Sequence, residues 1–465
     1  MRLTPAEPKI PKDVGFTDEN DIFGYREFGE RLANLVSNID EPLVIVLDAP
    51  WGSGKSVFIK QCAELIRGRG GSVVLFDAFG NDLHDDAFLA LASEIHFLAE
   101  KTLGDDNQSS QTFLDTAKRV GKTLAPIGLR LAARAGTAGL LNLEDFRAGG
   151  EAFKNVIKAL EDETEKILEN TISEKLQKTK EERALLGDFR EALENVSKSI
   201  SEKMQTEDRQ SLPLVFIVDE LDRCRPPFAL DVIERIKHLF SVPNVCFVLV
   251  MDLPQFETAV RGSYGGEFDA RTYLEKFYHL KIMLPEPNYV SQEKRDRYLE
   301  YLWRNLKPDF RDDHTAELVF REIRFLVNAH ELSLRKMERA LTNIVLVAAS
   351  VNKFKWFEPS LVAGLCIMRQ THPGLYERAQ ENSLTWEEVV SFLKIVDDRN
   401  DKNIIGRGPV LNWWRYLADP KMSQRELDKY FGMLMQDNSF NSRRSLQRTL
   451  TSYIDNLPNL PVHDT

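Results

Sequence analysis

The sequence predicts an α/β protein built on a five-stranded parallel sheet with helices on both faces. Five short runs rich in Val, Ile and Phe carry this prediction, at 43–47, 73–77, 214–218, 245–251 and 279–284. Several of them have almost no polar alternation, which is typical of parallel strands covered on both faces. Helical patterns lie between most of the runs, as in α/β folds. After residue 285 only helical patterns follow, which predicts a C-terminal all-α part.

The N-terminal segment precedes the first strand. Residues 1–20 are polar and proline-rich and are interpreted as an extended arm. A short helix is expected next, ending near Asp40, because apolar residues recur there at helical spacing. These residues are Phe28, Leu32, Leu35, Val36 and Ile39.

A long insertion separates the second run, which ends at Asp77, from the third, which begins at Leu214. Two amphipathic stripes within it predict long helices, forming a hairpin that turns near Lys178 to Arg183. The first stripe is Phe153, Val156, Ile157, Leu160, Ile167, Leu168 and Ile172, and the second is Leu186, Phe189, Leu193, Val196 and Ile200. The dense charges between them are interpreted as a solvated face.

A chain of 465 residues exceeds what one core usually fills, since domains hold roughly 150 residues. Four parts are predicted. They are an N-terminal arm at 1–20, an α/β core at 21–285 interrupted by a helical insertion at 105–210, a helical lid at 286–350, and a C-terminal helical domain at 351–465.

Composition narrows the function classes. The 61 Lys+Arg against 72 Asp+Glu give a formal charge of −11, which disfavours a surface that binds nucleic acid throughout. The four cysteines form no CxxC pair, so buried reduced thiols are expected rather than zinc ligands or disulfides. The N-terminus lacks the apolar stretch of a secretory signal, and the most apolar long segment, Leu124 to Leu143, is interrupted by Arg130 and Arg134. A cytoplasmic protein without a membrane span is therefore expected.

A glycine-rich loop directly follows the first predicted strand. It fits GxxxxGK[ST], with Ala49 in place of the first glycine. Small residues are needed here because backbone N–H groups must curl around phosphate oxygens, and a side chain at Gly52 or Gly54 would block that approach. Lys55 is expected to reach the β and γ phosphates, and the Ser56 hydroxyl to ligate Mg²⁺. The predicted nucleotide-binding residues are Ala49, Pro50, Trp51, Gly52, Ser53, Gly54, Lys55, Ser56 and Val57.

The alternative for this loop is a chance Gly-Lys-Ser turn. The strand before it and the apolar helix start after it, VFIKQCAELI, favour the phosphate-binding interpretation.

Carboxylates that complete a Mg²⁺-nucleotide site follow the third predicted strand, in LVFIVDELDRC. Asp219 is expected to hold Mg²⁺ through water, because this ion takes oxygen ligands. Glu220 is expected to act as the base that orients the attacking water. Acidic residues also end strands in ordinary loops, so this prediction depends on its pairing with the loop at 49–56.

Further catalytic candidates are one aspartate and several arginines. Asp252 follows the fourth predicted strand, where it either contacts the γ-phosphate or the attacking water, or simply caps the next turn. Arginines neutralise charge that develops on a transferring phosphoryl group. The candidates are Arg223, Arg271, Arg335 and Arg339, each with a surface salt bridge as the alternative. Arg335 and Arg339 are four residues apart on a predicted helix and so face the same way.

The loop, VFIVDELDRC, NVCFVLVMD and TYLEKFYHLKIMLPEP together resemble the KAP family of P-loop NTPases, over roughly residues 18 to 350. The resemblance implies ATP as the nucleotide, since no guanine-specific NKxD motif is present. In that family the motif at Asp219 usually begins with two aspartates, and Glu220 stands in the second place here. Prokaryotic members are often encoded on mobile elements or in antiviral loci, which implies a role in antiphage defence.

Many members of that family also carry transmembrane helices between the two nucleotide motifs. This chain departs from them, because Arg119, Lys122, Arg130 and Arg134 interrupt the corresponding segment. Residues 118–143 are instead interpreted as a helical packing element, with peripheral membrane contact or nucleic-acid binding as alternatives. The aromatic pair Trp413 and Trp414 is likewise interpreted as buried, with a base-stacking platform as the alternative.

The function predicted from these residues is a Mg²⁺-dependent ATPase that uses nucleotide turnover to drive conformational signalling or assembly with a partner protein or with itself. Two alternatives remain. One is a nucleotide-dependent interaction module that hardly hydrolyses ATP. The other is a P-loop kinase whose acceptor pocket would use Asp77, Asp82 and Asp85.

Overall fold

The computed structural model describes residues 7–39, 41–83, 86–137, 180–205, 212–285, 292–308, 312–350, 359–395 and 408–419, with a few further residues between 310 and 455. The chain divides into two compact units, with the boundary between Leu284 and Pro285. The sheet unit contains Lys9–Trp51 and Lys55–Leu284. The other unit, called the helical unit, contains the chain from Pro285 onward and also Pro8 and Gly52–Gly54. The finer division into a lid and a C-terminal domain stays a prediction.

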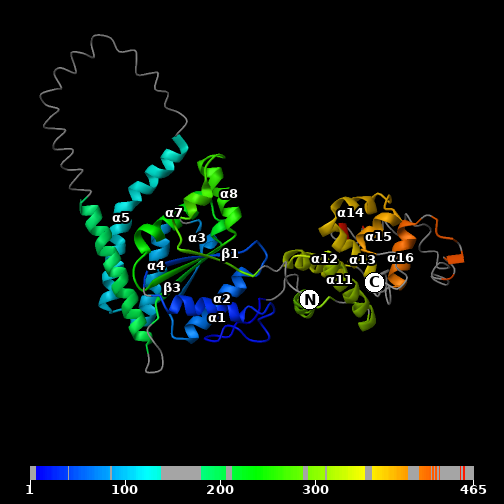
Figure 1. Ribbon diagram of the computed structural model, residues 1–465, viewed down its shortest axis with the longest axis horizontal. Helices are drawn as coiled ribbons and strands as arrows, with labels where there is room; N and C mark the ends of the chain where they lie inside the picture. The colour runs from blue at the N-terminus through cyan, green and yellow to red at the C-terminus, as the bar shows by residue number, and fades with distance from the viewer. Residues whose placement is uncertain are drawn as a thin grey trace, which may run out of the picture. The chain divides into compact units, whose positions relative to one another are not determined.

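Five parallel strands form the sheet, in the order β2-β3-β4-β1-β5 (Figure 1). Their bounds are β1 Leu43–Asp48, β2 Val73–Asp77, β3 Leu214–Asp219, β4 Val245–Met251 and β5 Leu280–Met283. Every residue of β1 and β4 is buried, because both strands lie inside the sheet. The predicted α/β fold with five parallel strands is confirmed.

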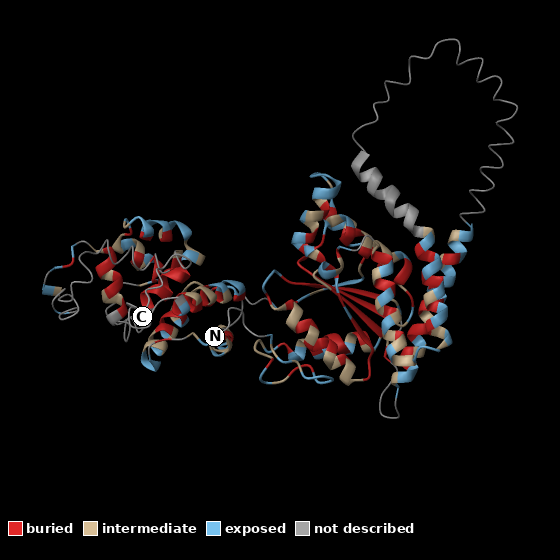
Figure 2. Cartoon of the chain, turned by 180° about the vertical axis from the view of Figure 1, so that it is seen from behind, coloured by how far each residue is buried: buried red, intermediate tan, exposed pale blue. Residues whose placement is uncertain are grey.

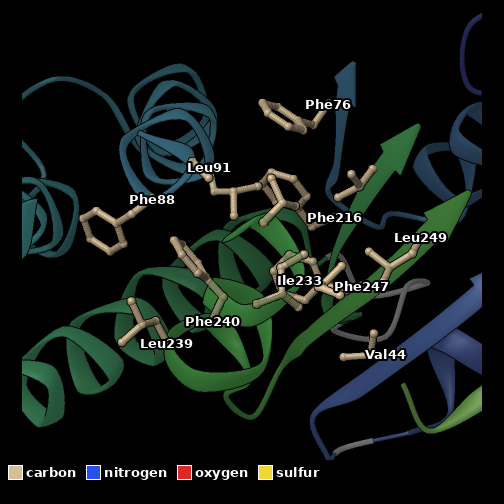
Figure 3. Packing of buried hydrophobic residues seen from close by; sticks show 14 of the residues in the cluster. Val44, Phe76, Phe88, Leu91, Phe216, Ile233, Leu239, Phe240, Phe247 and Leu249 are labelled. Carbon is tan, nitrogen blue, oxygen red and sulfur yellow. The ribbon is translucent and has the colours of Figure 1, made fainter. Parts of the chain in front are cut away.

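Two buried clusters cover the two faces of the sheet, and successive residues of β1 alternate between them. Ile45 packs in one cluster and Val44 in the other, where the rings of Phe216 and Phe247 stack at 5.2 Å (Figure 3). The first face is covered by α1 (Arg26–Ser37) and α2 (Lys55–Gly68), and the second by α4 (Ala87–Leu103), α7 (Pro226–Arg235) and α8 (Leu253–Tyr264). The shorter helices of this unit are α3 (Ala78–Asn81), η1 (Leu221–Arg223), η2 (Ile236–Phe240) and α9 (Ala270–Leu274).

The insertion contributes two helices to the same core, α5 (Gln108–Thr137) and a helix over residues 180–204. Phe189 is fully buried, and its ring lies 5.1 Å from Phe88, 5.6 Å from Phe113 and 5.3 Å from Phe240. The second predicted stripe is therefore helical and packed. The first stripe, Phe153 to Ile172, lies outside the described residues. The predicted turn is wrong for residues 180–183, because their charges lie on a helix that has already begun.

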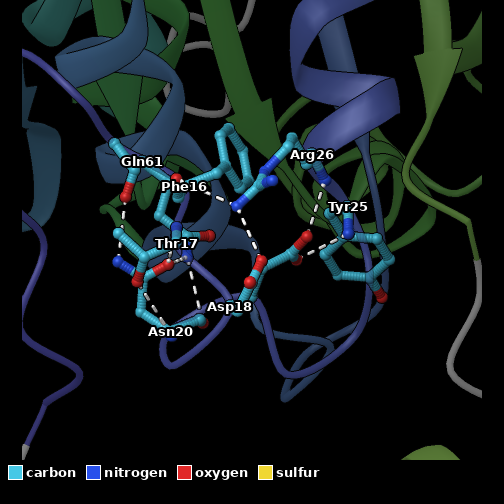
Figure 4. A network of polar contacts seen from close by, with 9 residues as sticks. Phe16, Thr17, Asp18, Asn20, Tyr25, Arg26 and Gln61 are labelled. Carbon is cyan, nitrogen blue, oxygen red and sulfur yellow. Dashed lines mark hydrogen bonds and ion pairs between the residues drawn. The ribbon is translucent and has the colours of Figure 1, made fainter.

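The N-terminal segment folds onto α1 and α2 through a polar network (Figure 4). The Asn20 amide donates to the carbonyl of Gly15 at 2.9 Å, and the Gln61 amide on α2 donates to Asn20 Oδ1 at 2.9 Å. The ring of Phe16 packs 6.0 Å from that of Phe58. These contacts make residues 9–24 part of the sheet unit.

Within the helical unit, the described secondary structure consists of helices alone. They are α10 (Gln292–Leu306), α11 (Asp313–Ala329), α12 (Leu334–Ser350), α13 (Pro359–Thr371), α14 (Pro373–Gln380), α15 (Trp386–Phe392) and α16 (Gly408–Ala418). Their inner faces hold the buried residues of this unit (Figure 2). Trp413 and Trp414 are 6% and 0% exposed, so the predicted buried pair is confirmed.

The segment at 118–143 is described to residue 137 only, and its side chains to residue 123. Ala117, just before this segment, and Val120 within it are buried in the core of the sheet unit. Arg119 pairs with Asp188 at 3.9 Å. Its beginning is thus a packed helix. Among the described residues, no helix is long and apolar enough to span a membrane.

Candidate nucleotide-binding site

The phosphate-binding loop connects the end of β1 to the start of α2. Ala49, Pro50, Trp51, Gly52, Ser53 and Gly54 form the loop, and Lys55, Ser56 and Val57 begin the helix. Gly52 and Gly54 have φ angles of +80° and +88°, which residues with a side chain rarely adopt. The loop therefore needs glycine at both positions. Its helix N-terminus adds a partial positive charge of the kind that binds phosphate.

Lys55 is buried at the base of this loop, and its Nζ donates to the carbonyl oxygen of Ala49 at 2.6 Å. Burial lowers the pKa of Lys55, while the carboxylates of Asp222, Asp252 and Asp219 oppose this shift. The structure thus brings the loop lysine to the acidic residues that follow β3 and β4.

Asp219 and Ser56 lie together. Asp219 ends β3, and the Ser56 hydroxyl donates a hydrogen bond to its carboxylate. Burial raises the pKa of Asp219, and the bonds from Ser56 and from the Glu220 N–H, at 2.8 Å, oppose the rise. A hydroxyl and a carboxylate in contact form an oxygen donor set that fits Mg²⁺. These two residues are the ones that would hold the ion.

Glu220 follows Asp219 in a left-handed conformation, with φ 60°. This backbone conformation is unusual for a residue with a side chain and is typical of functional turns. Arg223 Nη1 lies 2.6 Å from Glu220 Oε1. Burial raises the pKa of Glu220 and the Arg223 charge lowers it, while Asp219 and Asp77 add to the rise. A carboxyl with a raised pKa can accept a proton more readily than an ordinary one.

Asp252 performs the capping role that the sequence left open, and it also contacts the loop. Its side chain accepts from the Gln255 N–H at 3.3 Å, at the start of α8, and from the Trp51 N–H at 3.2 Å. The capping interpretation is thus confirmed, and the bond to Trp51 attaches Asp252 to the phosphate-binding loop. Its contact with the γ-phosphate or the attacking water stays a prediction.

Asp222 is a site residue that the sequence prediction missed. Its carboxylate accepts from the Trp51 indole Nε1 and from the Asp252 N–H, the latter at 3.0 Å. Its position, three residues after Asp219, was the available signal, but its partners come from distant parts of the sequence. Asp48 was missed as well; it accepts from the Leu253 N–H at 3.0 Å and pairs with Lys281.

The candidate arginines have different surroundings. Arg223 lies at the site through its pair with Glu220. Arg271 is largely exposed and pairs with Glu275 on the same short stretch of chain, at 3.6 Å. Arg335 and Arg339 lie on α12 in the helical unit. Which of them completes the site stays a prediction.

The acceptor pocket of the kinase alternative has a structural explanation at two of its three positions. Asp77 caps α3 by accepting from the Gly80 N–H at 2.8 Å. Asp82 accepts from the Arg225 N–H at 2.9 Å and from its Nε at 3.1 Å. Asp85 lies outside the described residues.

Residues 25–351 match the KAP family P-loop domain. The chain belongs to the KAP family. The resemblance stated from the motifs is thereby confirmed, and the chain is a P-loop NTPase by family and fold. Nucleotide binding is the general property of such domains.

The search of curated proteins found no match. Among solved structures, the chain is similar to the Aeropyrum pernix ORC2 protein (ADPNP-ADP complexes), with 13% sequence identity, 93% of each chain covered and a TM-score of 0.35.

Proposed function

We propose that the chain binds ATP with Mg²⁺ and hydrolyses it at the carboxyl ends of β1, β3 and β4. The observation that carries this proposal is the position of Lys55, where the charges of Asp222, Asp252 and Asp219 act on it, together with the hydrogen bond from Ser56 to Asp219. These groups come from three separate strands of the parallel sheet, and ligands of such sheets bind beyond the carboxyl ends of the strands.

Each residue of the site has its own role in binding or hydrolysis. The loop amides and Lys55 bind the phosphates, and Ser56 and Asp219 would hold the Mg²⁺ ion. When bound, the ion neutralises charge on the β and γ phosphates. Glu220 orients a water molecule and accepts its proton, because its raised pKa places it nearer to neutrality than an ordinary carboxyl. Positioning and electrostatics supply the rate enhancement, and no covalent intermediate is required.

Two substitutions test the assignment. Lys55→Ala is expected to abolish ATP binding, measured by isothermal titration, because the phosphates lose their cation. Glu220→Gln is expected to retain binding and to stop phosphate release. Glu234→Gln is the matched control, since this carboxylate accepts from the Tyr273 hydroxyl at 2.9 Å away from the loop. Hydrolysis by Glu220→Gln at the parental rate would show that another group acts as the base.

A second candidate function is an ATP-dependent interaction module that hardly hydrolyses. The observation that favours it is the 2.6 Å pair between Arg223 and Glu220, which occupies the proposed base. A phosphate-release assay with and without DNA, RNA or a partner protein separates the two functions. Release that begins only with one of these additions would indicate that the added molecule frees Glu220.

The biological role is proposed at a coarser level. ATP turnover or binding would change the conformation of the helical unit and signal to, or assemble with, a protein partner, in the cytoplasm and in antiphage defence as the family resemblance implies. Peripheral membrane contact through 118–143 remains a proposal for the part beyond the packed start of α5. Vesicle flotation with anionic lipids tests it directly, since a basic amphipathic surface binds such lipids.

A further inference from the structure

The carboxylate of Asp222 connects three segments that are far apart in the sequence. It accepts from the indole Nε1 of Trp51, which lies in the phosphate-binding loop. It also accepts, at 3.0 Å, from the backbone N–H of Asp252, the residue that follows β4. Asp252 closes the triangle, because its own carboxylate accepts from the Trp51 N–H at 3.2 Å. Asp222 itself lies in the turn that follows β3.

We propose that Asp222 is a positioning residue, which fixes the phosphate-binding loop and the turn carrying Glu220 relative to each other by holding the indole of Trp51. This inference rests on the proposed function, since it concerns the alignment of the catalytic base with the bound phosphates. The indole bond, the Asp252 N–H bond and the loop bond of Asp252 are together called the Trp51 latch.

The turn that holds Asp222 is short and stiff. Glu220 begins it with φ 60°, and η1 spans only Leu221–Arg223. The Arg223 N–H donates to the Glu220 carbonyl at 3.1 Å, across Asp222. A displacement of Asp222 therefore moves Glu220 with it, because two residues of a hydrogen-bonded turn leave little freedom between them.

The loop, in contrast, depends on glycines. Gly52 and Gly54 have left-handed φ angles and can adopt many others once the chain is released. Trp51 directly precedes them and carries a long, rigid side chain, so an anchor on its indole restrains the loop where its backbone is least restrained. Because Trp51 is 46% exposed, burial holds its side chain only in part, and the hydrogen bond to Asp222 adds a restraint on the indole.

Asp222 also acts on Lys55 through its charge. Among the carboxylates that raise the pKa of Lys55 and so oppose the effect of burial, Asp222 has the largest effect. A substitution of Asp222 therefore removes both a charge and a hydrogen-bond acceptor. Trp51→Phe removes the indole donor, keeps an aromatic side chain of smaller size and leaves every charge, which makes it the cleaner test of the latch.

The experiment measures steady-state ATP hydrolysis for the full chain and for Trp51→Phe, Asp222→Ala and the double variant. Alanine is used because an asparagine oxygen could still accept from the indole. Trp51→Phe is expected to lower kcat about tenfold, the usual size for one hydrogen bond to a charged group, with KM raised less than about threefold. The double variant is expected to match Asp222→Ala within about twofold, because both changes open the same latch. Asp269→Ala is the control, since this aspartate caps α9 at 3.1 Å from the Thr272 N–H. Parental kcat in Trp51→Phe, or multiplicative effects in the double variant, would overturn the proposal.

A fluorescence measurement keeps this test separate from the test of hydrolysis. The emission of Trp51 is obtained by subtracting the spectrum of Trp51→Phe from that of the parent, and that of the double variant from that of Asp222→Ala. The two difference spectra are expected to differ, with the indole more solvated when Asp222 is replaced. If the parent releases no phosphate, the proposed function fails while this comparison still decides whether the latch exists. Identical difference spectra would refute the latch whatever the hydrolysis rate.

Discussion

Replacing Phe189 by alanine tests whether the insertion is part of the folded core that supports the nucleotide site. The Phe189 side chain is fully buried, and three rings from α4, α5 and η2 surround it at 5.1–5.6 Å. A large-to-small change at a buried phenylalanine costs about 3–5 kcal/mol, and the upper part of this range applies where neighbours cannot collapse into the cavity. Here the neighbours belong to three different helices, which limits the collapse.

The cost is a large fraction of the roughly 5–15 kcal/mol that stabilises a typical domain. At about 2–4 °C per kcal/mol, the lowest-temperature unfolding transition of the full chain is expected to fall by roughly 10 °C, measured by scanning calorimetry. Phe97→Ala is the matched control, because Phe97 lies on α4 and is 64% exposed, and its loss should change stability by about 0.5 kcal/mol or less. Equal and small shifts for both variants would refute the packing of residues 180–204 on this core.

Three further predictions follow from single residues. Gly54→Ala is expected to weaken ATP binding about tenfold in a titration, because φ +88° costs a residue with a side chain roughly 1–2 kcal/mol and drives the loop out of this conformation. Gly187→Ala, with nothing near its added carbon, should bind as the parent does. Asp219→Asn is expected to raise the melting temperature of the nucleotide-free protein at pH 7, because burial raises the pKa of Asp219 and so disfavours its charged form in the fold. This gain in melting temperature should shrink as the pH falls through the raised pKa. A gain that persists at low pH would contradict the assignment. Burial lowers the pKa of His330 to about 4, and His372 and Lys394 add to the effect. The helical unit should therefore lose stability as the pH falls from about 6.5 towards 4. In melting curves recorded at several pH values, His330→Phe should flatten this dependence, whereas the exposed His314→Gln should not.

The strands could be predicted from the sequence because buried parallel strands leave a local signal. The run Val245–Met251 is apolar throughout, and every one of its residues is buried. The phosphate-binding loop was equally accessible, since its glycines and Lys55 occupy adjacent positions with a fixed spacing.

Three features were less accessible to sequence reasoning, for physical reasons. The turn expected near Lys178 to Arg183 was inferred from charge density, but charges suit an exposed helix face as well as a turn, and residues 180–183 are helical. Asp222 was missed because its partners, Trp51 and Asp252, follow different strands and meet it only when the sheet is assembled. The choice among the arginines has the same origin, as no local pattern distinguishes a surface ion pair from a phosphate contact.

The polar network around Asn20 bears on where this family domain begins in practice. The family match starts at residue 25, yet a chain trimmed to that point would lose Phe16 and Asn20. The Gln61 amide, only 2% exposed, would then keep neither of its Asn20 acceptors, and an orphaned buried donor costs roughly 1–3 kcal/mol. Since Gln61 lies on the helix that opens with Lys55, shortened versions of this protein should be designed from the polar anchor at residue 9 onward rather than from the alignment edge.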